Sequence, residues 1–442
     1  MRQLKNEFIH NLSWIFFGNI ILAFMQFIIN VFVARIISKD NYGLINYSSS
    51  LIAFFTAMFA LGFDGIVTKK FAEDRANKGL YLGTALVSRT AFAIVCIIFL
   101  QIIVRVISPG DTLLYKVTFI QSLTILFGAS DLLVYWYRFV NEAKIVAVTN
   151  FTAFFIAFIF KVIALAVFKN LYLYLFAVSA EVFLSMLIMS VYYFKHNRDK
   201  FGFSWKIFKK MISISYPFII SGILSAIYWQ TDKLMIKSFM DNAAVANYSV
   251  AMTMAGTISI ASTAIIEGFR PDIMNFKQTN ENLYKKRFRQ LYGLVFWICV
   301  VYCIFVTIFA KFLVLLIFGV KYLDAVPALY VVVWYVMFSY FSYINNLYMV
   351  AENKIKWIQI ITFIGSVINI ILNFILIPKF GIVGAALASL ITQVLANFIL
   401  VSIIPSLRGC FRLICDGITL KDINVKVKFK IKKAEEKKYD NI

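Results

Sequence analysis

The stretch LYGLVFWICVVYCIFVTIFAKFLVLLI, residues 291–317, indicates the fold class because Lys311 is its only charged residue. A helix that spans a bilayer needs about 20 consecutive, mostly apolar residues. Similar apolar runs recur along most of the chain. In hydrocarbon only helices and closed barrels pair every backbone polar group, and these runs are too long and continuous for barrel strands. We therefore predict an all-α polytopic membrane protein.

The apolar runs divide the chain into two halves of six spans each. The first half, residues 1–200, has predicted spans at 11–37, 42–67, 80–106, 113–138, 144–168 and 171–194. The second half, residues 201–408, has predicted spans at 211–239, 243–269, 291–317, 325–350, 356–378 and 382–408. Residues 409–442 form a basic tail, which we expect to lie in the cytoplasm or on the membrane surface. The first run is expected to be retained as a span, since no small-residue cleavage site follows it.

Charge supports this topology and gives it an orientation. Of 442 residues, 61% are hydrophobic and only 15% are charged, which excludes a soluble protein of this length. When Arg89, Lys161 and Lys233 within the spans are set aside and every other Lys and Arg is assigned to its nearest loop, 32 fall on the side of the two termini and 9 on the other. The positive-inside rule therefore places both termini in the cytoplasm. The net charge of +22 then faces anionic membrane lipids, and we expect no nucleic-acid partner.

Two short motifs repeat between the halves. Asp40-Asn41 with Asn46-Tyr47-Ser48 recurs as Asp241-Asn242 with Asn247-Tyr248-Ser249, at an offset of 201. Glu142-x-Lys144-Ile145 with Lys169 recurs as Glu352-x-Lys354-Ile355 with Lys379, at an offset of 210. Because six spans is an even number, both halves enter the membrane from the same side. We predict a pseudo-two-fold axis along the membrane normal, with a site between the halves.

Polar side chains follow one face of several predicted spans. Ser221, Ser225, Tyr228 and Asp232 share one face of the seventh span, and Thr362, Ser366, Asn369 and Asn373 share one face of the eleventh. Such stripes indicate either helix–helix hydrogen bonds or a water-filled interior. The small residues from Gly381 to Ser389 suit close helix packing.

Seven charged residues lie within the spans. The carboxylates are candidate coupling or gating groups, because buried acids can exchange protons during transport: Asp64, Asp131, Glu181 and Asp232. The cations are candidate substrate-binding groups for a phosphate: Arg89, Lys161 and Lys233. Two alternatives stay open. Arg89 could be the structural partner of Asp131 or Asp64, and the two lysines could extend to the outer interface.

The sequence contains no catalytic motif. It has no Gly-rich phosphate loop and no nucleophile–base motif, so we expect neither an enzyme nor an ATP-driven pump. An integral-membrane glycosyltransferase or ligase is the enzyme alternative, and the short predicted loops disfavour it. The five cysteines and two histidines lack metal-ligand spacing, so no metal or cofactor is expected.

One late stretch resembles a known family. Residues 368–388, INIILNFILIPKFGIVGAALA, are similar to a signature of the Wzx-type polysaccharide flippases. Ala34-Arg35, Asp232-Lys233 and Ala351-Glu352-Asn353-Lys354 also resemble that family, so the similarity extends over nearly the whole chain. Its superfamily also includes multidrug exporters and lipid II flippases. The latter typically have two further spans, and some multidrug exporters use an acidic residue in the first span, which this chain lacks.

The resemblance implies a flippase for an undecaprenyl-pyrophosphate-linked oligosaccharide in the bacterial plasma (inner) membrane, where O-antigen and capsule units are moved to the outer leaflet. A polysaccharide polymerase is a further candidate partner. The residues agree with this reading, because a pyrophosphate and many hydroxyls cannot cross hydrocarbon unaided. A cation-coupled exporter of small organic molecules is the alternative, and a binding or structural protein ranks third because of the buried charges.

Overall fold

The computed structural model describes residues 21–197 and 199–419, and all of the regular structure in these ranges is helical. The first ten residues of the predicted first span and most of the basic tail lie outside the described residues. After a helix at Ile21–Ile36, the first half consists of α2 (Lys39–Phe59), α3 (Phe63–Glu73), α4 (Lys78–Ile107), α5 (Thr112–Gly128), α6 (Leu132–Phe139), α7 (Ala143–Ala166) and α8 (Leu171–His196).

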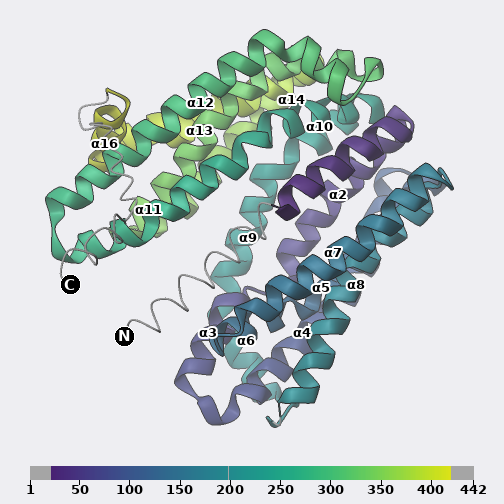
Figure 1. Ribbon diagram of the computed structural model, residues 1–442, viewed down its shortest axis with the longest axis vertical. Coiled ribbons are helices and arrows are strands. Elements are labelled where there is room, and N and C mark those ends of the chain that lie inside the picture. The colour runs from purple at the N-terminus through teal and green to yellow at the C-terminus, as the bar shows by residue number, and fades with distance from the viewer. Residues whose placement is uncertain (1–20, 198, 420–442) are drawn as a thin grey trace, which may run out of the picture.

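The second half begins with α9, the helix that lies between the two lobes in Figure 1. Its helices are α9 (Trp205–Phe239), α10 (Asn242–Ala255), α11 (Ser259–Thr279), α12 (Glu281–Ile317), α13 (Val326–Ala351), α14 (Lys356–Val394), α15 (Leu400–Ile403) and α16 (Arg408–Ile418).

The described helices account for the predicted spans. Ten of them, counted with their continuations across breaks, are long and apolar enough to cross a membrane, and Ile21–Ile36 is a shorter apolar helix. The last of the ten, Lys356–Ile403, covers two predicted spans. Gly381 divides it, with a backbone φ of +57° that no α-helix contains. The all-α fold with two groups of spans is therefore confirmed.

Three predicted spans are broken rather than continuous. The second is interrupted between α2 and α3, where Leu61 and Gly62 adopt left-handed φ values of 52° and 59°. The fourth passes through a 3₁₀ turn at Ala129–Asp131, and the eighth through another at Gly256–Ile258. Gly62 packs so closely on α9 that an added Cβ would lie 2.7 Å from the Cβ of Phe218. Hydropathy does not detect such breaks because they leave the apolar pattern intact.

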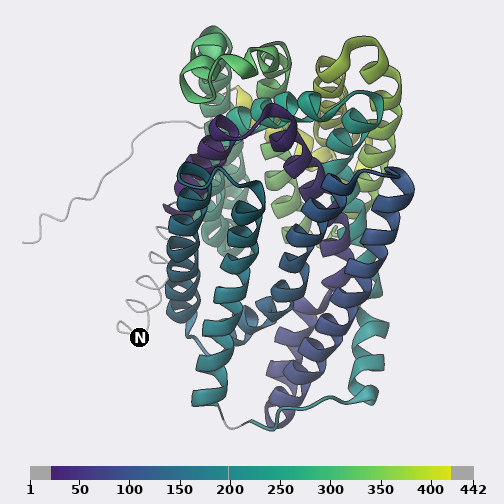
Figure 2. The ribbon, with the colours of Figure 1, turned by 90° about the vertical axis from the view of Figure 1, so that its right-hand side faces the viewer.

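The two lobes meet along α2 and α10, which lie side by side near the middle of the molecule (Figures 1 and 2). The first repeated motif forms the beginning of each of these helices. Ser38 caps α2 and Asp241 caps α10, each by accepting a backbone N–H three residues later. At Gly43 an added Cβ would lie only 1.7 Å from the carbonyl oxygen of Asn242. The repeated sequence thus marks the contact between the pseudo-symmetric halves.

Further contacts lie around the beginnings of α2 and α10 and close this end of the molecule, which we call the latched end. Arg35 donates from Nε to the carbonyl of Ile317 at 2.7 Å and so caps the end of α12. Lys39 pairs with Asp324 at 2.7 Å, which joins α2 to the 3₁₀ turn Val320–Ala325. These contacts connect the first half to the second, so the two lobes cannot separate at this end unless they break.

The second repeated motif forms equivalent turns. Asn141 and Asn353 have left-handed φ values of 61° and 54°, and each follows the end of a span. Lys169 and Gly381 have the same conformation at the next turn along each half, with φ values of 47° and 57°. The two members of each pair are separated by the same number of residues along the chain. This separation is two residues longer than the offset of 210 in the repeated motif. Asn tolerates this conformation better than most residues.

The repeated Glu352 connects three helices of the second half. The hydroxyl of Tyr284 donates to its carboxylate at 2.9 Å, and Lys277 forms an ion pair with it. Partial burial raises the pKa of Glu352, but the hydrogen bonds from Lys277 and Tyr284 outweigh this effect and hold the pKa below its ordinary value. Glu352 is therefore ionised at neutral pH and anchors the loop between α13 and α14 to α11 and α12.

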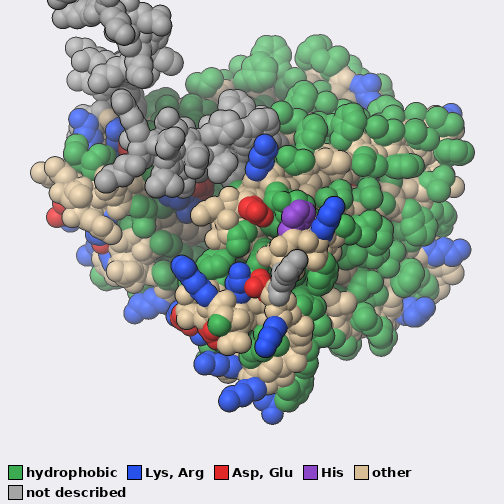
Figure 3. Space-filling view, turned by 60° about the horizontal axis from the view of Figure 1, so that its bottom comes forward, with side chains coloured by type: hydrophobic (Ala, Val, Ile, Leu, Met, Phe, Trp, Pro, Cys, Tyr) green, Lys and Arg blue, Asp and Glu red, His purple; other side chains and the backbone are tan. Residues whose placement is uncertain are grey.

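The outer surface is that of a multi-pass membrane protein. Large apolar side chains are exposed along the outward faces of the helices, among them Phe99, Phe160 and Ile308. Figure 3 shows this apolar flank beside a group of charged side chains at the end turned toward the viewer. Exposed apolar area on this scale would not be stable in water.

The first part of the predicted tail is a packed helix. In α16, Cys410, Leu413 and Ile414 are buried, and the helix packs along α12. The indole Nε1 of Trp297 on α12 donates to the carbonyl of Ile418 at 3.3 Å. The strong amphipathic pattern of α16 explains why hydropathy alone assigned residues 409–418 to the basic tail.

We predict that Gly43→Ala opens the latched end, because the new methyl group would overlap the Asn242 carbonyl. Spin labels at positions 39 and 324, in a protein with its native cysteines replaced, should be farther apart than in the same labelled protein with Gly43. Gly65→Ala is the matched control, because nothing lies within 4 Å of its new Cβ. An unchanged distance distribution in Gly43→Ala would contradict the assigned contact.

Candidate functional site

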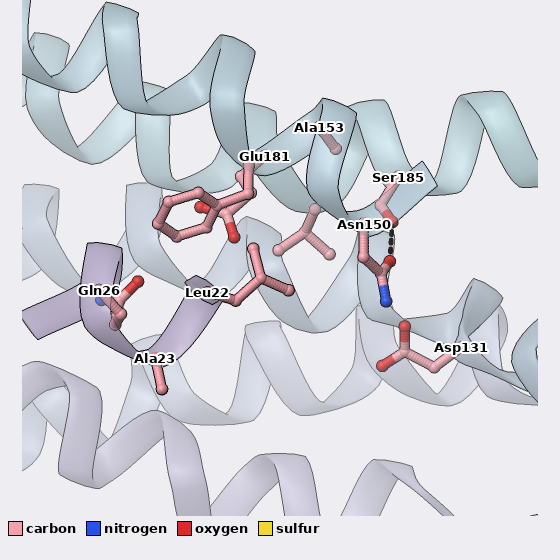
Figure 4. A pocket seen from close by; sticks show the side chains of 10 residues that line it. Leu22, Ala23, Gln26, Asp131, Asn150, Ala153, Glu181 and Ser185 are labelled. Atoms are coloured by element: carbon pink, nitrogen blue, oxygen red, sulfur yellow. Dashed lines mark hydrogen bonds between the residues drawn. The ribbon is translucent and has the colours of Figure 1, made fainter. Parts of the chain in front are cut away.

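The interior of the first half contains two adjoining polar cavities. The larger, of about 430 Å³, is lined by Gln26, Asp131, Asn150, Glu181 and Ser185 among others (Figure 4). Within it, the hydroxyl of Ser185 donates to Asn150 Oδ1 at 2.7 Å.

The smaller cavity has a volume of about 270 Å³ and shares Gln26 and Glu181 with the larger one. Lys161 also lines it, and Thr253 of α10 contributes from the second half. The cavity therefore reaches the boundary between the lobes. Polar and apolar side chains share the walls of the larger cavity, whereas amide, hydroxyl and charged groups make up most of the wall of the smaller one. The smaller cavity therefore suits water, ions or sugar hydroxyls better than an apolar ligand.

Arg89 stabilises the break in the second span. Its Nε and Nη2 donate to the carbonyl of Ala60 at 2.9 and 2.6 Å, and Nη2 also pairs with Asp64 at the start of α3. The left-handed residues after Ala60 remove that carbonyl from the regular helical pattern. It accepts instead from the backbone N–H of Phe63 at 3.2 Å and from the guanidinium of Arg89. The structure thus selects Asp64 as the ion-pair partner of Arg89.

Lys161 forms the second intramembrane ion pair, with Glu181. Lys161 on α7 is almost fully buried, and its Nζ also lies 5.3 Å from the centre of the Phe154 ring. The structure therefore does not show the alternative in which Lys161 extends to the outer interface. The helices α7 and α8 pack closely along their length, and this holds the pair inside the bundle.

In both ion pairs the cation is buried and the carboxylate is the more exposed partner. The Arg89 side chain is 3% exposed against 41% for Asp64, and Lys161 is 3% exposed against 27% for Glu181. Asp131, which lines the larger cavity, is exposed and forms no ion pair among the described residues. The first half therefore presents carboxylates on its accessible side and keeps its cations behind them. An accessible face of this kind favours a proton or a cation over an anion.

Asp232 is the centre of a polar cluster in the second half. It is buried, and it accepts from the hydroxyl of Tyr248 at 2.6 Å, from Asn373 Nδ2 at 2.7 Å and from the hydroxyl of Ser389. Asn373 also donates to Asn369 Oδ1 at 3.0 Å. All of the hydrogen-bonding partners of this carboxylate are neutral. No salt bridge offsets its charge within the described part of the chain.

Lys233 follows Asp232 on α9 but faces a different environment. It is partly exposed, and the described residues offer it no ion pair or side-chain hydrogen bond. Of the three predicted substrate-binding cations, Lys233 is therefore the one whose ammonium group is not already bonded to a carboxylate. The structure does not bring the three cations together, because two lie in the first half and Lys233 lies in the second.

The predicted stripes of the seventh and eleventh spans face each other. Ser366 donates to the carbonyl of Leu224 at 3.3 Å, and an added Cβ at Gly365 would lie 2.7 Å from the Tyr228 ring. Sequence analysis did not assign Tyr248 and Ser389 to the Asp232 cluster. Signals for both were present, because Tyr248 belongs to the first repeated motif and Ser389 to the small-residue stripe.

The described residues contain no group of three or more His, Cys, Asp or Glu side chains that could hold a metal ion. The cavities and clusters described above combine two ion pairs, neutral hydrogen-bonding groups, and three charges without an ion pair among the described residues, namely Asp131, Asp232 and Lys233.

These features define the protein as a two-lobed, multi-pass membrane protein with the architecture of known transporters and flippases. The chain belongs to the family described as "Polysaccharide biosynthesis protein", whose model matches residues 8–269. It is similar to the capsular polysaccharide biosynthesis protein CapF of Staphylococcus aureus, with 21% identity over 88% of this chain and 97% of CapF. It is also 27% identical to the uncharacterized membrane protein MJ1068 of Methanocaldococcus jannaschii over 54% of this chain, a match that spans only 50% of that protein.

Solved structures share the fold. The lipid II flippase MurJ in an inward closed conformation superposes with a TM-score of 0.69 at 17% identity, covering 93% of this chain and 91% of MurJ. An inward-facing multidrug resistance MATE transporter superposes with a TM-score of 0.65 at 12% identity, covering 90% of this chain and 96% of that chain. At these identities the comparison establishes the architecture alone.

We predict that Arg89→Ala lowers the free energy of unfolding by about 2–3 kcal/mol, since it removes two hydrogen bonds to the Ala60 carbonyl and leaves Asp64 without a counter-ion. Adding Asp64→Ala should recover part of the loss, whereas adding Asp131→Ala should not. Arg138→Ala is the control, because Arg138 is exposed. Denaturant unfolding of the purified protein measures all four. Equal losses in Arg89→Ala and Arg138→Ala would show that the Ala60 contact has no structural role.

Proposed function

We propose that this protein is a flippase that moves an undecaprenyl-pyrophosphate-linked oligosaccharide from the inner to the outer leaflet of a bacterial plasma membrane. The observation that carries the proposal is its membership of the polysaccharide-biosynthesis family, combined with a two-lobed fold that has polar cavities inside the membrane. A polar interior would shelter the sugar and pyrophosphate while the lipid tail stays in the bilayer.

On this proposal both termini are cytoplasmic and the latched end faces outside. The orientation rests on the bias of Lys and Arg toward the loops on the side of the termini. Alternating access would then break the contacts of Gly43, Arg35 and Lys39 and reclose the lobes at the opposite end.

Lys233 is the first group that we assign to the substrate pyrophosphate. Its ammonium group forms no ion pair among the described residues, whereas Arg89 and Lys161 are bonded to Asp64 and Glu181. Those two cations would bind phosphate only after their pairs open. Their carboxylates would then be released to take up a proton or a cation, which joins the predicted coupling groups to the predicted binding groups.

We assign coupling first to Asp232. Its carboxylate has only neutral hydrogen-bonding partners among the described residues, so exchange of a proton or a monovalent cation there would break no ion pair. Tyr248 fixes its orientation from α10, and Asn373 and Ser389 do so from the two segments of α14 on either side of Gly381. Ion uptake would therefore change the packing between α9, α10 and α14.

The alternative is a cation-coupled exporter of small organic molecules. The observation that favours it is the carboxylate-lined cavity of the first half, with Asp131 and Glu181 in its wall. Such a cavity would bind an organic cation directly. The substrate assay below distinguishes the two functions.

We predict that Lys233→Ala slows flipping at least about tenfold, because one lost phosphate contact corresponds to roughly 1.5–3 kcal/mol. The assay uses proteoliposomes with a fluorescent undecaprenyl-pyrophosphate oligosaccharide that a membrane-impermeant quencher reaches only on one side. Lys233→Arg should retain most of the activity. Lys209→Ala, an exposed lysine on the same helix, is the control.

Transport of an organic cation by the wild-type protein, with no flipping of the lipid-linked sugar, would refute the flippase and support the exporter. Flipping that is equally fast in Lys233→Ala would refute only the role of Lys233.

We further predict that Asp232→Asn abolishes the response of transport to a proton or sodium gradient. Asparagine has nearly the same shape and still accepts hydrogen bonds, so the melting temperature should change little. Asp241→Asn is the matched control, because asparagine caps helices as well as aspartate does. Gradient-driven transport that persists in Asp232→Asn would exclude Asp232 as the coupling group.

A further inference from the structure

A groove on the lipid-facing side of the first half lies between α4 and α5. It has a volume of about 430 Å³ and is separate from the interior cavities, with which it shares no lining residue. Apolar side chains line its deeper part, from α4 and from α5: Ile97, Ile98, Ile102 and Phe119. Because α4 ends and α5 begins beside this groove, it opens near the latched end of the molecule.

Two cations lie at one end of the groove. Arg105, in the last turn of α4, and Lys116, in the second turn of α5, both line it. Both side chains are exposed, and neither forms an ion pair among the described residues. The rim therefore carries two positive charges that no group in the described part of the chain neutralises.

Tyr115 gives this end of the groove a fixed shape. Its hydroxyl donates to the carbonyl of Ser108 at 2.7 Å and accepts from the backbone N–H of Gly110, also at 2.7 Å. The guanidinium of Arg105 lies 5.7 Å from the centre of the Tyr115 ring. The hydrogen bonds to the connecting loop hold the ring in place, and the ring in turn positions Arg105 at the rim.

Gln101 provides an unused donor between the charged rim and the apolar part. It lines the groove one turn from Arg105, and its side-chain Nε2 is buried without a hydrogen-bond partner. A buried amide donor of this kind costs stability unless a partner occupies the groove. The ester or phosphate oxygens of a lipid head group would supply such an acceptor.

The length of the groove matches one leaflet. Ile97 and Arg105 are eight residues apart on α4, which corresponds to about 12 Å along the helix. The hydrocarbon of one leaflet is about 15 Å thick, half of the bilayer core. Arg105 at the interface would therefore place Ile97 and Ile98 beside most of an acyl chain.

We propose that this groove binds one anionic phospholipid of the leaflet at the latched end. Arg105 and Lys116 contact its phosphate, Gln101 donates to its head-group or ester oxygens, and the isoleucines pack along one acyl chain. The site is distinct from the proposed transport path, so it holds whichever substrate the protein moves.

Native mass spectrometry of the full chain, exchanged into detergent containing phosphatidylglycerol or phosphatidylcholine, tests the proposal. The wild type should retain one phosphatidylglycerol in preference to phosphatidylcholine. The double variant Arg105→Ala with Lys116→Ala should lower that retention by about 30-fold, because each cation near a lipid surface contributes roughly 1 kcal/mol. Lys311 is an exposed cation of α12 that also lies near the latched end, and Lys311→Ala should leave retention unchanged.

A second variant separates the chain contact from the charge contact. Ile98→Trp fills the apolar part while both cations remain, and it should also lower retention of phosphatidylglycerol, with an unchanged melting temperature. Equal retention of both lipids by the wild type, or equal loss in Lys311→Ala, would show that the cations act only as general interfacial anchors and would overturn the proposal. Competition by soluble glycerophosphate as strong as that by phosphatidylglycerol would overturn the acyl-chain part.

Discussion

The carbonyl of Ala60 illustrates the constraint on which the arrangement of this protein depends. A backbone polar group inside a membrane must have a partner, because no bulk water is available to it. Where Leu61 and Gly62 turn left-handed, the second span loses its regular hydrogen bonds, and the Ala60 carbonyl accepts instead from the Phe63 N–H and from Arg89 of the third span. The positive charge introduced in this way needs an anion, and Asp64 meets that need. One break in a helix thus determines the contacts of three elements.

The same requirement is met differently in the two halves. In the first, Arg89 and Lys161 are each neutralised by a carboxylate on a neighbouring element. In the second, Asp232 is held by a phenol, an amide and a hydroxyl, none of which carries charge. Paired charges are expensive to separate and therefore favour a stable bundle. A carboxylate with neutral partners can change its charge state without losing an ion pair, which suits a group that responds to ions.

The contact between the halves is compact and specific. At Gly43 the backbones of α2 and α10 approach so closely that no side chain fits, and Arg35 and Lys39 add polar contacts around this point. Polar and glycine-mediated contacts can be broken and re-formed with less loss of stability than a large apolar interface. The latched end is therefore suited to opening as a unit.

The sequence by itself determined the number and order of the spans, the two groups of six, and the polar stripes along the seventh and eleventh spans. These follow from apolar length and from helical periodicity, which are properties of short segments. It also identified Asp64, Arg89, Lys161, Glu181 and Asp232 as charges that need partners, because a charge inside a membrane has few stable environments.

Only the tertiary structure decided which partners they have. Arg89 faced two equally plausible carboxylates, and the choice of Asp64 depends on a helix break that hydropathy does not register. Tyr248 and Ser389 reach Asp232 from helices other than its own, and they lie 16 and 157 residues from it along the chain. The relative rotation of packed helices determines such contacts. That rotation results from close packing over the whole bundle, which the periodicity of any single span does not specify.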